Sequence, residues 1–75
     1  MNTDRRKAIS VIISELEGIQ ARIADIQNAE QDAFDNLPEG LQQGEKGQAM
    51  EEATDTLSEA ENMLDEAAQH LGNIQ

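Results

Sequence analysis

Apolar residues recur along most of the chain at alternating steps of three and four, and this spacing predicts two long amphipathic helices. In the first half, one slot of the apolar stripe holds Glu30. In the second half, large residues alternate with alanine, which lets two helix backbones approach closely. The stripes are formed by Ile9, Ile12, Leu16, Ile19, Ile23, Ile26 and Ala33, and by Met50, Ala53, Leu57, Ala60, Leu64, Ala67, Leu71 and Ile74.

Proline and glycine separate the two stripes. Pro38 ends the first helix, because proline disfavours helix at the preceding residue and cannot donate a backbone hydrogen bond. The glycines after it, as far as Gly47, are typical of a turn. Thr3 or Asp4 can cap the first helix. The predicted elements are a first helix over residues 4–36, a turn over 37–45 and a second helix over 46–73, within a single domain of residues 1–75.

A short connection makes the two helices antiparallel neighbours, so the predicted fold class is all-α, an antiparallel two-helix hairpin of the coiled-coil type. Large and small residues alternate across the pair if facing residue numbers sum to 83, which places Ile23 opposite Ala60. One seam leaves further apolar residues uncovered. We therefore expect a homodimer that forms a four-helix bundle, or else docking onto another protein. The predicted oligomer interface consists of Ile13, Phe34, Ala49 and Met63.

The formal net charge of −11 lies entirely in the middle of the chain. Twelve acidic residues and one base, Lys46, stand between Glu30 and Glu66 inclusive. Such a surface repels phosphates, and with one Phe and no Trp or Tyr there is no stacking platform, so direct nucleic-acid binding is excluded. No cysteine is present for disulfides or thiolate metal sites, and no apolar run is long enough to span a membrane. A cytoplasmic location fits this composition.

His70 is the only histidine, and Glu66 lies one helical turn before it. Di-iron bundles instead repeat glutamate and histidine three apart on two helices, so we expect a half-buried histidine near Glu15 and no metal. The segment from Glu39 to Glu51 lacks the alternating acids of a calcium-binding loop. The chain is therefore predicted not to be an enzyme, with no catalytic, cofactor-binding or metal-binding residues and no cofactor.

The acidic residues of the second helix fall into rows. One row advances in steps of four and another, containing Glu52 and Glu66, in steps of seven. Lysines that would normally interleave one turn away are missing. Two interpretations stay open: a face that binds a basic protein surface in the manner of a DNA mimic, or a solvated face that maintains solubility. The candidate partner-binding residues are Glu51, Glu52, Asp55, Glu59, Asp65 and Glu66.

The turn and the start of the second helix carry a resemblance to a known group of proteins. The stretch Leu37-Pro38-Glu39, the step Glu45-Lys46-Gly47 and the run from Ala49 to Ala53 resemble small acidic helical-hairpin proteins of bacteriophage and prophage genomes. That resemblance implies a phage accessory protein in a bacterial host cell, acting as an inhibitor or regulator of a host nucleic-acid-handling (defence) protein. The alternative is a structural or assembly protein that works by helical self-association.

Overall fold

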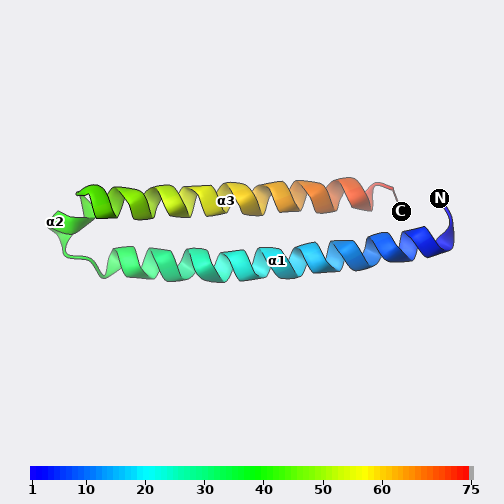
Figure 1. Cartoon of the computed structure of the whole chain (residues 1–75), viewed down its shortest axis with the longest axis horizontal. Helices are drawn as coiled ribbons and strands as arrows, with labels where there is room; N and C mark the ends of the chain where they lie inside the picture. Colours follow the sequence, from blue (N-terminus) through cyan, green and yellow to red (C-terminus); the bar gives the residue numbers. More distant parts are fainter. Residues whose placement is uncertain (75) are drawn as a thin grey trace.

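The computed structural model describes residues 1–74 and confirms an extended antiparallel helical hairpin (Figure 1). Helix α1 spans Thr3–Asp35, the one-turn helix α2 spans Glu39–Gln42, and helix α3 spans Glu45–Gly72. The described residues contain no strand. The hairpin measures 58 × 15 × 11 Å between Cα extremes, and α1 begins at the end of the molecule where α3 finishes.

The N-terminus of α1 is capped by Asn2 rather than by the predicted Thr3 or Asp4. The Asn2 side chain accepts a hydrogen bond of 2.9 Å from the backbone N–H of Arg5. Thr3 and Asp4 already lie in the first helical turn, where the Asp4 carboxylate favours the positive end of the helix dipole. The cap therefore moves the helix start one residue earlier than predicted.

The turn contains the helix α2, which the sequence did not predict. The side-chain amide of Gln42 donates to the backbone carbonyl of Phe34 at 3.0 Å, which ties α2 to the last turn of α1. On the other side, the backbone of Gln42 lies against Gly47 in the first turn of α3, and a Cβ atom at Gly47 would overlap it. Gly47 is the one buried residue among residues 1–74. The close approach of these two backbones requires glycine at this position.

The seam between α1 and α3 differs from the predicted one. Half-buried residues follow a seven-residue repeat, but Ile12, Ile19 and Ile26, which were predicted to fill it, are 44%, 42% and 58% exposed. Positions one residue later, such as Ile13 and Phe34, take their place. The seam consists of Ile9, Ile13, Leu16, Gln20, Ile23, Gln27, Glu30 and Phe34 of α1 with Gly47, Met50, Thr54, Leu57, Glu61, Leu64, Ala68 and Leu71 of α3.

Hydrogen bonds from two glutamines cross the seam. The side-chain amide of Gln20 donates to the backbone carbonyl of Glu61 at 2.9 Å, and that of Gln27 donates to the carbonyl of Thr54 at 3.1 Å. Both of these pairs of residue numbers sum to 81, whereas Gln27 and Ser58, which are also hydrogen-bonded, sum to 85, so the three bonds lie on either side of the predicted sum of 83. The apolar stripe of α1 is wider than one neighbouring helix can cover. Helix α3 packs against the edge of the stripe that also contains Gln20 and Gln27.

The seam includes polar groups that are imperfectly satisfied. Gln27 also donates to the hydroxyl of Ser58 at 2.5 Å, whereas the carboxylate oxygen Oε1 of Glu61 is buried without a hydrogen-bond partner. A buried polar atom left unpaired costs about 1–3 kcal/mol. The layer formed by Gln20 and Glu61 is therefore retained at a cost in stability.

Replacing both members of this layer, Gln20→Leu with Glu61→Leu, is expected to raise the free energy of unfolding by about 1–2 kcal/mol. The gain comes from removing the unpaired carboxylate oxygen and adding apolar contact in the seam. Urea denaturation followed by circular dichroism measures it. The exposed Gln48→Leu serves as the control and should change stability by less than about 0.5 kcal/mol. A loss of stability in the double variant would contradict this description of the seam.

Candidate acidic interface and an uncovered apolar face

An acidic row runs along the side of α3 that faces away from α1. The residues of this row stand seven apart in the sequence. Three of them come two positions after a seam residue, as Glu59 comes after Leu57. Two positions correspond to a rotation of about 200° around the helix axis, so these side chains lie on the side opposite the seam. Successive members stand about 10.5 Å apart along the axis. All are exposed. We call this set, Glu45, Glu52, Glu59 and Glu66, the acidic row.

The other predicted partner-binding residues flank the acidic row on one side. Glu51, Asp55 and Asp65 are exposed and lie between the row and the seam. Asp65 accepts a 2.7 Å hydrogen bond at Oδ2 from the side-chain amide of Gln69, which orients its carboxylate. The structure therefore gathers all six candidate residues on one part of the α3 surface. Glu61 is the exception among the nearby acids, because it turns into the seam.

The opposite flank of the hairpin is apolar. Residues three positions after the apolar seam residues, such as Ile19 after Leu16 and Ala60 after Leu57, lie beside the seam on each helix. Because the two helices are antiparallel, the residues three positions after the seam residues of α1 and those three positions after the seam residues of α3 lie on the same side of the hairpin. We call this set the isoleucine–alanine face: Ile12, Ile19, Ile26 and Ala33 of α1 with Ala53, Ala60, Ala67 and Ile74 of the second half. Ala60 and Ala67 are half-buried in the hairpin, and the other six residues are exposed.

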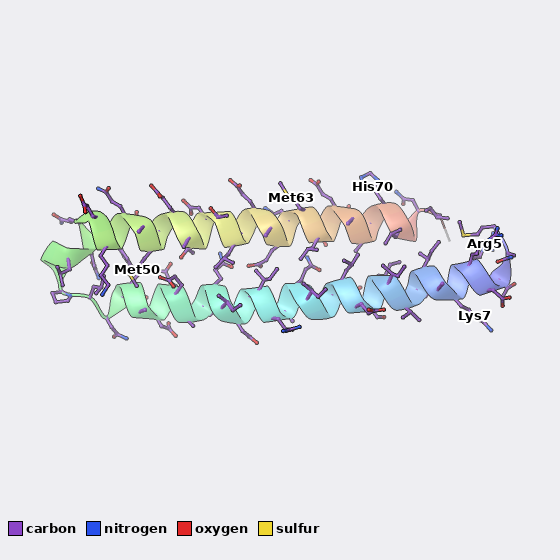
Figure 2. All side chains as sticks on the ribbon, viewed as in Figure 1. Arg5, Lys7, Met50, Met63 and His70 are labelled. Atoms are coloured by element: carbon purple, nitrogen blue, oxygen red, sulfur yellow. The ribbon has the colours of Figure 1, made fainter. Side chains whose placement is uncertain are left out.

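The four residues predicted as an oligomer interface do not share a surface. Ile13 and Phe34 are half-buried in the seam of the hairpin itself. Ala49 and Met63 are exposed and border the isoleucine–alanine face, with Met63 67% exposed. Figure 2 shows this contrast for the methionines: Met50 points between the helices and Met63 points away from α1. Sequence reasoning missed Ile12, Ile19 and Ile26 as surface residues because it had assigned them to the seam.

The one histidine does not lie where the sequence predicted it. His70 is exposed and points away from α1 (Figure 2), so the expected half-buried position near Glu15 is wrong. Within residues 1–74 there is no pocket and no group of three or more acidic, histidine or cysteine side chains that could hold a metal ion. Among the described helices, none combines the length and the apolar composition that a membrane span needs.

Comparison with known proteins gives no match to a family model, to a curated protein or to a solved structure. The resemblance to phage hairpin proteins stays a prediction. Two surfaces then carry the functional argument, the acidic row with its flank and the isoleucine–alanine face.

Proposed function

We propose that the protein is a non-catalytic binding protein whose acidic row and flank bind a basic protein surface. The observation that carries this proposal is the concentration of exposed carboxylates on α3 with no base among them. Six exposed carboxylates lie between Glu51 and Glu66, and this stretch contains no lysine or arginine. A surface of this kind focuses a negative potential toward a cationic partner.

The spacing of these charges supports competition with nucleic acid. The six carboxylates are spread over about 22 Å of helix axis, or one charge in about 4 Å. Duplex DNA presents one charge in about 1.7 Å of axis, and each of its strands one phosphate in about 3.4 Å. A groove that contacts the backbone of one strand therefore meets a similar linear charge density on α3.

The biological setting of this proposal comes from the resemblance of the turn region. A phage accessory protein with such a face would inhibit or regulate a host nucleic-acid-handling protein, for example one used in defence. A second function, structural assembly through helical self-association, is favoured by a separate observation, the exposed isoleucine–alanine face.

Affinity capture from a bacterial lysate at low salt tests the proposal, with bound proteins eluted by a salt gradient and by duplex DNA. We expect a basic nucleic-acid-handling protein to elute at moderate salt, because exposed charge contacts are screened over about 10 Å at 0.1 M salt. We also expect duplex DNA to displace it. A partner that neither salt nor DNA releases, or recovery of nothing except copies of the chain itself, would contradict the proposal.

A further inference from the structure

We propose that a second copy of the chain covers the isoleucine–alanine face, related to the first by a two-fold axis that crosses α1 near Ile19. The result is a four-helix bundle in which each helix has two neighbours. This inference does not depend on the acidic row being a binding site.

The first argument is the absence of a core in the single hairpin. None of the hydrophobic residues among residues 1–74 is buried. A domain of this size needs all the apolar burial that it can obtain, so a chain without a core requires a partner for its apolar surface. Five of the eight large hydrophobic residues that remain exposed lie on the isoleucine–alanine face or at its border: Ile12, Ile19, Ile26, Met63 and Ile74.

The second argument is the size of the face. The hairpin is 58 Å long and 15 Å wide between Cα extremes, and one broad side of it is the isoleucine–alanine face. The residues that define the face span 21 positions in each half of the chain, or about 32 Å of axis. The face itself therefore covers on the order of 500 Å², and the residues that border it bring the buried area toward the roughly 800 Å² per partner of a stable interface. A single peptide helix would leave part of a face this wide uncovered, whereas a second hairpin matches it.

The third argument is where the charges lie. Residues of α3 that border the face (Ala49, Thr56, Met63 and His70) include no carboxylate, and the acidic row lies on another side of the helix. Two chains of net charge −11 can therefore meet on this face with their acidic rows in solvent. The face itself has no charged residue to attract an acidic or basic partner, whereas a second copy brings an equally apolar face to cover it.

The border of the face on α1 determines the arrangement of the two copies. Glu15 and Arg22 are both exposed there, seven residues apart, and so about 10.5 Å from each other along the axis. That separation prevents an ion pair between Glu15 and Arg22 of the same chain. A two-fold axis near Ile19 brings Glu15 of each copy beside Arg22 of the other copy, so the dimer contains this ion pair twice. The same axis places Ile12 opposite the partner's Ile26.

The ends of the hairpin agree with this axis. The basic segment Arg5-Arg6-Lys7 lies at one end, as Figure 2 shows for Arg5 and Lys7, and the acids Asp32 and Asp35 lie at the other end of α1. Running α1 antiparallel to its copy brings the basic end of each α1 toward the acidic end of the partner's α1, without direct contact to Asp32, which stands three seven-residue repeats after Val11 and shares its side of the helix. An axis parallel to the hairpin would instead place two acidic turn ends together, which charge repulsion disfavours.

Sedimentation equilibrium of the full chain tests the dimer. We expect about twice the monomer mass of 8.2 kDa. Ile19→Glu should weaken dimerisation by at least about 100-fold, because it places a carboxylate against its own copy on the axis. Val11→Glu is the matched control: Val11 is also on α1, is 57% exposed and faces away from the apolar face, so the dimer should persist. A wild-type chain that stays monomeric at millimolar concentration would overturn the proposal.

Two further variants test the arrangement without loss of apolar contact. Glu15→Arg and Arg22→Glu should each weaken the affinity of dimerisation by about 10-fold. The double variant that carries both substitutions should restore it, because each ion pair is then re-formed with its charges exchanged. The chain has no cysteine of its own, so Ile19→Cys should form a disulfide with its copy under mild oxidation, whereas Val11→Cys should not. A dimer in which the double exchange restores nothing and Ile19→Cys does not cross-link would overturn the two-fold axis near Ile19.

Discussion

Gly47→Ala is expected to lower the free energy of unfolding by about 2–4 kcal/mol. A Cβ atom at this position overlaps backbone atoms of Gln42, and a backbone cannot move aside as a flexible side chain can. Relief of the overlap requires α2 to separate from the first turn of α3. That movement also breaks the hydrogen bond from Gln42 to the carbonyl of Phe34. Thermal or urea denaturation followed by circular dichroism measures the loss.

The matched control is the same substitution in the middle of α1. A Cβ atom at Gly18 would meet nothing within 4 Å, so Gly18→Ala adds helix propensity without overlap and should stabilise the hairpin by about 0.5–1 kcal/mol. The two variants therefore move stability in opposite directions. If Gly47→Ala were as stable as the wild type, the description of the turn as two backbones in close contact would be wrong.

Reversing three charges of the acidic row, Glu52→Lys, Glu59→Lys and Glu66→Lys together, is expected to reduce affinity for the basic partner by at least about 100-fold. All three side chains are exposed, and the change relieves repulsion among neighbouring acids, so the helix should remain folded. Titration calorimetry or surface-bound titration against the captured partner measures the loss, with circular dichroism as a check on helix content.

A second triple variant separates position from total charge. Asp4→Lys, Asp25→Lys and Asp32→Lys lie on exposed parts of α1, on the side that faces away from α3 and away from the acidic row and its flank. Each reversal adds two charges, so both triple variants change the net charge from −11 to −5. We expect the α1 variant to retain most of the affinity. Equal losses in the two variants would mean that general charge, rather than the acidic row, attracts the partner.

The long elements of this fold follow from spacing alone. The three-and-four spacing of apolar residues correctly predicted two helices, and Pro38 correctly predicted the end of α1 before it. Helix α2 could not be predicted in the same way, because a single turn of four residues is too short to show a period. It depends instead on a contact with Gly47, which lies on another helix.

The seam residues of α1 were missed for a physical reason that is visible in α1 itself. Apolar residues of α1 occupy three positions of the seven-residue repeat, for example at Ile12, Ile13 and Leu16, so the apolar stripe is wider than the two positions that one seam uses. A stripe of that width is typical of a helix with two neighbours, and a single seam can use only part of it. Treating the hairpin as a complete two-helix pair assigned Ile12, Ile19 and Ile26 to the seam, where Gln20 and Gln27 in fact lie. The width of the stripe was the signal that these residues could remain on the surface.

The acidic candidates were easier to place than the apolar ones. Glu52, Glu59 and Glu66 share one side of any regular helix, whatever packs against it, so the sequence alone sufficed. Ile13 and Phe34 depend on where the seam lies, and this is a property of the pair of helices.

The salt dependence of binding tests the role of the acidic row most directly. The affinity of the wild-type chain for its captured partner should fall by at least about ten-fold between roughly 50 and 200 mM salt, and the reversed acidic row should largely abolish this dependence. An affinity that is the same at both salt concentrations would contradict the account and would mean that the acidic row serves solubility rather than binding.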